Sequence, residues 1–426
     1  MTPTQPAPAA TGRCVVVGAS MGGLRAAEAV RKAGFTGEIV VVGEEPHMPY
    51  NRPPLSKEAL GGGLDPAALR FRIPRAAGDV TWRLGERVAA TDLAARTVTL
   101  ENGDVLAWTG LVVACGLRPR RLAVPGPPGG RHVIRTIEDV QRLRDALSPG
   151  ARLAVVGAGF IGCEVAATAR ELGVEVDVIA PTAVPVERPL RRMLGAALQR
   201  RHEARGVRFH LGVAPVEFRG GDHVTSLLLG DGTELPADVV VEAVGCVPNV
   251  EWLDGNGLDL TDGVLCDDRL RVEGRADVVA CGDIARFPNP LFGGVPRRVE
   301  HWSMVTETAR RAGHTLGRAL TGAEPDPAPF APIPSFWSDQ YGMRIQSFGV
   351  PDLGAEDVRV LDGDLDDEVA VGYHRDGRLM GVVLIGLRSH YMRYRALIAE
   401  NAEHDRGGAP VPQDRVAERT VGGSRA

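Results

Sequence analysis

VVVGASMGG (Val15 to Gly23) and LAVVGAGFIG (Leu153 to Gly162) are the two stretches that decide the fold of this chain. Each is a run of β-branched residues that leads through a glycine-rich turn into an alanine-rich helical stretch. Glycines let such a turn close tightly, and the unpaired N–H groups of the following helix attract a pyrophosphate. One such turn is a weak signal. Two in full strand–turn–helix context predict that the chain binds two dinucleotides, an arrangement typical of electron transfer between them.

Each turn opens a predicted βαβ unit. In the first unit Glu44 ends the second strand, where a carboxylate can accept hydrogen bonds from both ribose hydroxyls of an adenosine. Ser20 replaces the central glycine of this turn, which forbids the closest backbone approach. The second unit keeps its glycines, and its strand EVDVIA ends at Ala180. With no acid at that strand end, the residues leave the choice between NADH and NADPH open; arginines follow at Arg188, Arg191 and Arg192.

The remaining segments differ in kind. PYNRPPLSK (Pro49 to Lys57) has too many prolines for a helix and is predicted to be a rigid extended loop. CGDIA places Asp283 after a strand and before an expected helix, where it can accept a hydrogen bond from a cofactor hydroxyl or serve as a helix cap. Alternation in the last 95 residues predicts antiparallel strands with a two-residue turn at Asp376-Gly377, followed by the helical segment SHYMRYRALIAENA.

Composition narrows the class of protein. A chain of 426 residues suits two or three domains, and its net charge of −5 argues against a nucleic-acid binder. No apolar run approaches the ~20 residues that span a bilayer, and the N-terminus does not resemble a signal peptide. Six scattered cysteines without metal-ligand spacing indicate a reduced, cytoplasmic protein without a metal site. Only Lys32 and Lys57 are lysines among 49 basic residues, which makes Lys57 conspicuous.

Five segments together resemble a known family: VVVGASMGGLRAAEAVR, GEEPHMPYNRPPLSKE, GFIGCEVAATARELG, CGDIARFPNPLFGG and FWSDQYGMRIQ. They are similar, in the same order, to the FAD-dependent NAD(P)H:ferredoxin reductases of the putidaredoxin and rhodocoxin reductase type, within the pyridine nucleotide–disulfide oxidoreductase superfamily. The resemblance implies an α/β fold with two Rossmann-like domains and a C-terminal α+β interface domain. It assigns residues 12–117 and 247–329 to FAD, 118–246 to NAD(P)H and 330–405 to the interface domain. The Pro/Ala-rich start and the polar end of the chain predict flexible ends at 1–11 and 406–426.

The resemblance also implies site residues. The FAD contacts would be Gly18, Ser20, Gly22, Gly23, Glu44, Arg52, Lys57, Val88, Arg135, Asp283 and Trp302. The NAD(P)H contacts would be Gly157, Gly159, Ile161, Gly162 and Glu164, with NADH favoured. Lys57 and Glu164 would pair beside the flavin, and Trp337 would lie near the flavin and the partner protein unless it is a core aromatic. These three are the catalytic candidates.

The expected electron path is a hydride onto FAD and single electrons outward. Residues 45–60 contain no cysteine, which excludes dithiol chemistry at the position where disulfide reductases carry it. The resemblance implies a small, acidic iron–sulfur ferredoxin as a transient partner of a monomer or weak dimer. This ferredoxin would supply an oxygenase, either a haem-thiolate monooxygenase or a dioxygenase. Candidate docking arginines are Arg297, Arg298, Arg344, Arg388, Arg393 and Arg395, although such arginines can be a solvated face and the stretch from Asp352 to Glu368 is acidic.

Two other functions stay open on the residues alone. One is an NADH oxidase or a reductase of small acceptors such as quinone or monodehydroascorbate. The other is a redox-responsive flavoprotein in which NADH binding changes shape or oligomeric state instead of driving turnover. The intact second turn and Lys57 weigh against the latter.

Overall fold

A computed structural model describes residues 12–62 and 65–404 of the chain. Its first sheet has five parallel strands in the order β19-β7-β1-β2-β3. The strands are β1 (Arg13–Val17), β2 (Glu38–Gly43), β3 (Thr81–Leu84), β7 (Gly110–Val113) and β19 (Val278–Ala280). The central strands are nearly continuous runs of buried valine, as expected for a parallel sheet covered on both faces.

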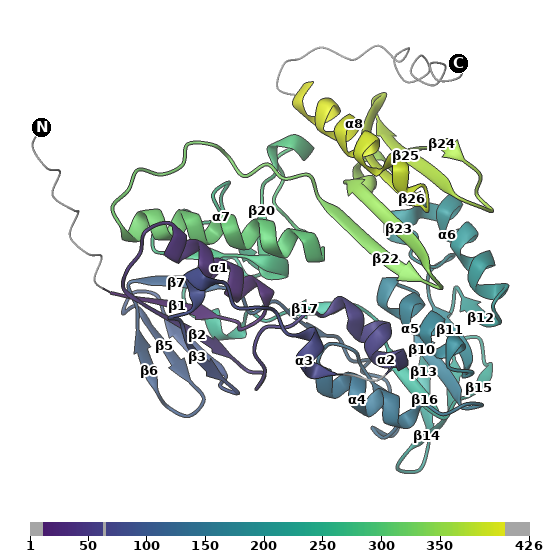
Figure 1. The fold of residues 1–426 in the computed structure, drawn as a ribbon. Helices are drawn as coiled ribbons and strands as arrows, with labels where there is room; N and C mark the ends of the chain where they lie inside the picture. The colour runs from purple at the N-terminus through teal and green to yellow at the C-terminus, as the bar shows by residue number, and fades with distance from the viewer. Residues whose placement is uncertain (1–11, 63–64, 405–426) are drawn as a thin grey trace, which may run out of the picture.

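Two helices lie side by side against this sheet, α1 (Met21–Lys32) and α7 (Trp302–Leu320) (Figure 1). Their close approach depends on glycine: a Cβ on Gly313 would lie 2.4 Å from the carbonyl oxygen of Ala26. α7 begins at Trp302 and α1 ends at Lys32, so the first domain is made of two chain segments that are far apart in the sequence. A meander of β4 (Val88–Asp92), β5 (Thr97–Leu100) and β6 (Val105–Ala107) and a small sheet of β18 (Val264–Leu265), β20 (Ala285–Phe287) and β21 (Arg297–Arg298) complete it.

The chain passes twice between the first and second domains. The outgoing strand β8 (Leu117–Pro119) and the returning strand β17 (Cys246–Pro248) pair with each other in antiparallel fashion. The second sheet, in the order β12-β11-β10-β16-β9, is also parallel. Its strands are β9 (Arg131–His132), β10 (Arg152–Val156), β11 (Glu175–Ala180), β12 (Val207–Leu211) and β16 (Val239–Glu242).

The second domain also holds helices and a meander. The helices are α4 (Ile137–Ala146), α5 (Phe160–Glu171) and α6 (Glu187–Glu203), and the meander is β13 (Pro215–Gly220), β14 (Val224–Leu229) and β15 (Glu234–Pro236). The short helices α2 (Glu58–Gly62) and α3 (Pro66–Leu69) belong to the segment after the proline-rich motif. Figure 1 shows α2 and α3 between the first sheet and the second domain.

The third domain is an antiparallel sheet in the order β22-β23-β26-β25-β24. It contains β22 (Ser335–Gln340), β23 (Met343–Gly349), β24 (Asp357–Gly363), β25 (Val369–Arg375) and β26 (Arg378–Ile385), followed by α8 (Tyr391–His404). The predicted turn is confirmed, because Asp376 and Gly377 have φ of 52° and 74° between the paired residues Arg375 and Arg378. In Figure 1 this domain lies next to α5 and α6.

The predicted fold class is confirmed, with two local corrections. Pro53–Ser56 forms a 3-10 helix rather than an extended loop, since proline is tolerated in the first turn of a helix. Asp283 lies in a 3-10 turn that leads into β20, not into a longer helix. The ends at 1–11 and 406–426 lie outside the described residues. Within the described part of the chain, no helix has the length and apolar character to cross a membrane.

Candidate functional site

The first glycine turn has the geometry that its sequence requires. Gly18 has φ of 116°, and a Cβ there would lie 2.2 Å from the carbonyl oxygen of Ala114. A Cβ on Gly23 would lie 1.9 Å from the oxygen of Gly18, so both positions need glycine. Ser20 caps α1 with φ of −99°, which any residue can adopt. Serine therefore fits at the central position, and its side chain makes no capping hydrogen bond.

The second turn repeats this geometry and leaves its centre open. Gly157 has φ of 112°, and a Cβ on Gly162 would lie 2.0 Å from the oxygen of Gly157. At Gly159, in contrast, an added Cβ would meet nothing within 4 Å. Gly159 is the N-cap of α5, and the nearby Ile161 is 46% exposed. The backbone at the start of α5 is thus accessible to a phosphate, as a dinucleotide site requires.

A pocket of about 300 Å³ lies beside the strand end at Glu44. Its other lining residues are Gly85, Glu86, Arg87, Leu100, Glu101 and Asn102. Val88, a predicted FAD contact, begins β4 directly after Arg87 and is itself buried. A pocket with a strand-end carboxylate at its rim has the residue types that suit an adenosine.

The strand register places the position that selects between NADH and NADPH one residue after Ala180. In each βαβ unit the first glycine of the turn donates its N–H to a strand carbonyl at 2.8 Å, Gly18 to Val42 and Gly157 to Ile179. Two residues further along lie Glu44 in the first unit and Pro181 in the second. The counterpart of Glu44 is therefore Pro181, and Ala180 is 2% exposed within the core. Neither residue can pair with a ribose hydroxyl or a 2′-phosphate through its side chain.

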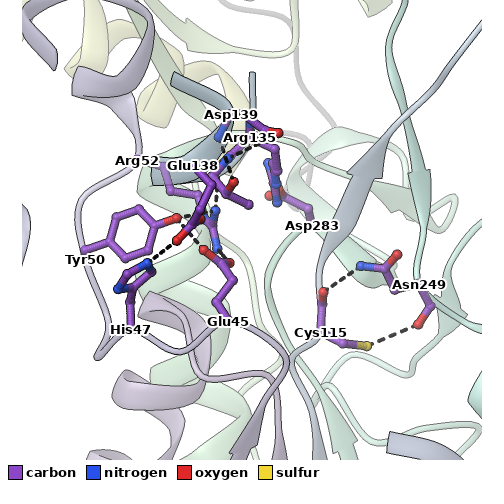
Figure 2. Close-up of polar contacts among 11 residues, drawn as sticks. Glu45, His47, Tyr50, Arg52, Cys115, Arg135, Glu138, Asp139, Asn249 and Asp283 are labelled. Carbon is purple, nitrogen blue, oxygen red and sulfur yellow. Dashed lines mark hydrogen bonds and ion pairs between the residues drawn. The ribbon is translucent and has the colours of Figure 1, made fainter. Parts of the chain in front are cut away.

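A polar cluster joins the first domain to the start of α4 (Figure 2). The Arg52 guanidinium pairs with the Glu45 carboxylate and donates to the carbonyl oxygen of Arg135 at 2.6 Å. The Tyr50 hydroxyl donates to the same carboxylate at 2.5 Å. The Arg52 side chain is only 13% exposed, so its charge is committed to these protein partners. This arrangement fixes the residues that flank Arg135 in relation to the first domain.

Asp283 and Arg135 face each other across the domain junction in Figure 2. Their nearest charged atoms are 3.9 Å apart, and the Asp283 side chain is 17% exposed. Burial raises the pKa of Asp283, and the Arg135 charge acts in the opposite direction. No residue in the described part of the chain donates a hydrogen bond to this carboxylate at closer range, which leaves it available to a cofactor hydroxyl. Trp302, the first residue of α7, stacks on Phe71 with ring centroids 6.5 Å apart.

The predicted pairing of Lys57 with Glu164 is present. Lys57 Nζ lies 2.6 Å from Glu164 Oε2, and the two side chains are 13% and 4% exposed. Lys57 also donates to the carbonyl oxygen of Pro53 at 3.0 Å and to the Ser56 hydroxyl at 3.2 Å, so all three of its donors are used. A buried ion pair needs such extra hydrogen bonds to offset desolvation. It joins the proline-rich segment of the first domain to α5 of the second.

Three polar residues missed at the sequence level extend this pair. Ser338, on β22 of the third domain, donates to Glu164 Oε1 at 2.6 Å, and Gln340 Nε2 donates to the Ser338 hydroxyl at 2.9 Å. His202 Nε2 lies 2.7 Å from Gln340 Oε1. Ser338 and Gln340 lie with Phe336 on the buried face of β22, and they alternate with the more exposed Trp337 and Asp339. That period-two pattern of buried polar residues was the available signal.

Trp337 lies on the other face of β22 and is half-buried, so it is not a core aromatic. The Arg344 guanidinium lies 5.1 Å from the centre of its ring. Of the candidate docking arginines, several are already paired: Arg298 with Asp262 and Glu300, Arg344 with Asp339, and Arg393 with Asp362. Arg297 donates to the oxygen of Phe292 at 3.0 Å. Arg388 and Arg395 are exposed and have no ion pair within the described residues, so the free basic surface is smaller than the sequence suggested.

The cysteines have no redox partner. All six are free, and burial raises the pKa of Cys115 to about 12, although the Trp252 indole N–H lowers it. A buried neutral thiol is a poor nucleophile. Within residues 12–62 and 65–404, no group of three or more potential ligands could hold a metal ion.

Comparison with known proteins identifies the family to which the chain belongs. The pyridine nucleotide-disulphide oxidoreductase family matches residues 12–313, and a reductase C-terminal domain matches residues 335–414. The chain is 36% identical over 414 residues to the ferredoxin–NAD(+) reductase component of the anthranilate 1,2-dioxygenase system of Burkholderia cepacia, covering 96% of this chain and 97% of that one. It is 32% identical to rhodocoxin reductase of Rhodococcus erythropolis, with 90% and 89% covered.

Solved structures of ferredoxin reductases have the same fold. Putidaredoxin reductase in its covalent complex with putidaredoxin superposes with a TM-score of 0.86 at 28% identity, covering 96% of each chain. The ferredoxin reductase for the CYP199A2 system from Rhodopseudomonas palustris gives 0.82 at 33% identity, covering 89% of this chain and 92% of that one. The resemblance seen in the sequence is thereby confirmed: the chain belongs to the pyridine nucleotide–disulphide oxidoreductases, among their FAD-dependent ferredoxin reductases with a reductase C-terminal domain.

Proposed function

We propose that the protein takes a hydride from NADH onto FAD and passes single electrons to a small iron–sulfur ferredoxin that supplies an oxygenase. The Lys57–Glu164 pair carries the proposal, because it joins the two dinucleotide domains at a buried point. The absence of cysteine from residues 45–60 supports an exit of electrons through the flavin and not through a disulfide. The names of the relatives, which are ferredoxin–NAD(+) reductase components of oxygenase systems, support the same partner class.

The residues fit both cofactors. Gly18, Ser20 and Gly23 shape the turn that would hold the FAD pyrophosphate, and Glu44 would accept hydrogen bonds from its ribose. Asp283 would accept a hydrogen bond from a cofactor hydroxyl. FAD would also contact the remaining predicted residues of its site, Gly22, Arg52, Val88, Arg135 and Trp302. The nicotinamide nucleotide would contact Gly157, Gly159, Ile161 and Gly162. When bound, FAD supplies the conversion of one hydride into two single electrons.

The chain's own contribution is positioning and charge. Lys57 would place a cation where negative charge develops on hydride arrival, and such fixed charges act strongly when water is excluded. Glu164 holds Lys57 in place at 2.6 Å. Trp337, on the outer face of β22, would lie between the redox centre and the partner. We assign residues 12–117 and 247–329 to an FAD domain, 118–246 to an NAD(P)H domain and 330–405 to an interface domain, and the three five-stranded sheets support this division.

The docking surface we propose for the ferredoxin centres on the start of α8. Arg388 and Arg395 are exposed there, and Met392 between them is 73% exposed. An apolar side chain flanked by unpaired arginines suits a transient complex with an acidic protein. Free cysteines throughout support a reducing, cytoplasmic location.

NADH is proposed as the donor because the relatives are named for NAD(+). The strand end itself supplies no acid, so discrimination against NADPH should be modest.

A coupled assay tests the function. The purified protein is mixed with NADH or NADPH, with and without a 2Fe–2S ferredoxin, and with cytochrome c as final acceptor. We expect fast cytochrome c reduction only when ferredoxin is present. Turnover that ignores ferredoxin but is fast with oxygen or quinone would replace the proposal with an oxidase or small-acceptor reductase.

A further inference from the structure

One hydrogen-bonded chain of buried side chains crosses all three domains. It runs from Lys57 through Glu164 and Ser338 to Gln340 and His202, with neighbouring atoms 2.6 to 2.9 Å apart. Ser338 and His202 are 0% exposed and Gln340 is 1% exposed. Each of the four links is within hydrogen-bond distance, and only Nδ1 of the terminal His202 has no partner within the described residues. Burying so many polar groups is costly unless they are paired, so the continuous run of bonds from His202 to Lys57 indicates a specific role.

The donors in this chain all point toward Glu164. Ser338 uses its only proton on Glu164 Oε1, so its oxygen must accept from Gln340 Nε2. Gln340 Oε1 then faces His202 and must accept from Nε2–H, which fixes the tautomer of a buried, neutral imidazole. Each acceptance strengthens the next donation, because hydrogen bonds in a chain polarise one another.

The two oxygens of Glu164 are held from different domains. Oε2 accepts from Lys57 and Ser56 of the first domain, each at 2.6 Å. Oε1 accepts only from Ser338 among the described residues. Without that third contact the carboxylate could rotate about its last bond, and Lys57 would move with it. The third domain therefore fixes a pair that belongs to the other two.

We infer that Ser338 is a positioning residue for the Lys57–Glu164 pair, oriented in turn by Gln340 and His202. The inference rests on the proposed function, in which that pair lies beside the flavin. It gives the C-terminal domain a part in the reduction of the flavin in addition to the docking of a partner. Ser338 acts through Glu164 and is not itself a catalytic residue.

Ser338→Ala tests the inference, and Ser347→Ala is its matched control. Ser347 lies on the neighbouring strand, is also 0% exposed, and its hydroxyl has no hydrogen-bond partner within the described residues. The measurements are the rate of flavin reduction by NADH in stopped flow, the affinity for NADH and the midpoint potential of the flavin. For Ser338→Ala we expect a rate about tenfold lower with affinity within about twofold, the pattern of a lost transition-state contact. The potential should also shift. Ser347→Ala should change none of these three quantities, and Ser338→Thr, which keeps the hydroxyl, should retain most of the rate.

A double-mutant comparison separates positioning from general damage. In a Glu164→Gln background, Ser338→Ala should lower the rate by less than about twofold further, because its target is already altered. Gln340→Leu gives a second, independent variant should Ser338→Ala not fold. Equal effects of Ser338→Ala and Ser347→Ala, or full additivity with Glu164→Gln, would overturn the inference. These assays contain no ferredoxin, so a failed ferredoxin assay would overturn the proposed function alone.

Discussion

Glu164 and Ser338 are 174 positions apart in the sequence, and their side chains meet at 2.6 Å in the core. Glu164 is on the helix after the second glycine turn, and Ser338 is on the first strand of the C-terminal sheet. The contact connects two domains at the point where a third, through Lys57, supplies a positive charge. The Lys57–Glu164 pair therefore lies at a junction of domains, so its geometry depends on how the domains are assembled.

Loss of the buried Lys57–Glu164 ion pair should lower the stability of the protein. Lys57→Met leaves the Glu164 carboxylate without its cation and should lower the free energy of unfolding by about 3 kcal/mol. Lys57→Met combined with Glu164→Gln should recover part of that loss. The other lysine of the chain is the control: Lys32 is 64% exposed beside Glu28, and Lys32→Met should cost at most about 1 kcal/mol. Thermal unfolding of the FAD-loaded proteins measures the stability of the unaltered protein and of these three variants. Similar losses for the two lysines would contradict the assignment.

Substitution of Gly162 and of Gly159, two of the three glycines of the second turn, should have different consequences. Gly162→Ala forces a Cβ within 2.0 Å of the Gly157 oxygen and should destabilise the protein by about 1–3 kcal/mol. Gly159→Ala meets no atom within 4 Å and should fold normally, but its methyl group would stand where the pyrophosphate approaches. Its dissociation constant for NADH should rise at least about tenfold. Calorimetry and NADH titration check both, and unchanged NADH affinity in Gly159→Ala would place the nucleotide elsewhere.

The strand-end register predicts how to sharpen nicotinamide choice. Ala180→Gly combined with Pro181→Glu copies the Gly43-Glu44 pattern of the first unit. The new carboxylate should accept hydrogen bonds from the ribose of NADH and repel the 2′-phosphate of NADPH. We expect the ratio of kcat/KM for NADH over NADPH to rise about tenfold or more, the effect of about 1.4 kcal/mol. Pro181→Gln carries no charge and should change the ratio less. A larger effect of Gln than of Glu would refute the electrostatic reason.

The start of α8 should govern ferredoxin coupling alone. Arg388→Glu and Arg395→Glu should each slow ferredoxin-dependent cytochrome c reduction at low salt, with little effect on flavin reduction by NADH. Arg144→Glu, on α4 of the second domain, is the matched control, because Arg144 is likewise exposed and has no ion pair within the described residues. In the unaltered protein, rising ionic strength should slow only the ferredoxin step. If salt acts equally on both steps, the arginines are merely a solvated face.

His301 should make stability depend on pH. Burial lowers the pKa of His301 from 6.5 to about 4, and its Nδ1 has no hydrogen-bond partner within the described residues. The unfolded chain binds a proton at higher pH than the folded one, so this contribution is complete above pH 6.5 and is lost as the pH falls toward 4. The loss should be on the order of 3 kcal/mol. His301→Phe should flatten the fall in unfolding temperature over that range and leave the slope above pH 7 unchanged. Identical curves for both proteins would show that His301 does not titrate in this way.

Local patterns were sufficient for much of this protein. The glycine turns, their helices and the Asp376-Gly377 hairpin follow from steric limits on the backbone within a few residues, so they were predictable. The 3-10 helix at Pro53–Ser56 was missed because proline forbids a helix interior but permits its first turn. The assignment of Pro181, and not Ala180, as the counterpart of Glu44 required the hydrogen-bond register between turn and strand. Spacing along the chain does not give that register.

The sequence by itself determined the two dinucleotide folds, the family and the candidates Lys57 and Glu164, because each depends on short-range backbone geometry or on a contiguous motif. Only the tertiary structure decided what surrounds them. It paired Arg298, Arg344 and Arg393 with acids, and it brought Ser338 and His202 to the Glu164 network. Those partners come from segments far apart in the chain. Burying a polar group requires a partner with complementary hydrogen-bonding atoms, and only the packing of the three domains specifies which partner that is.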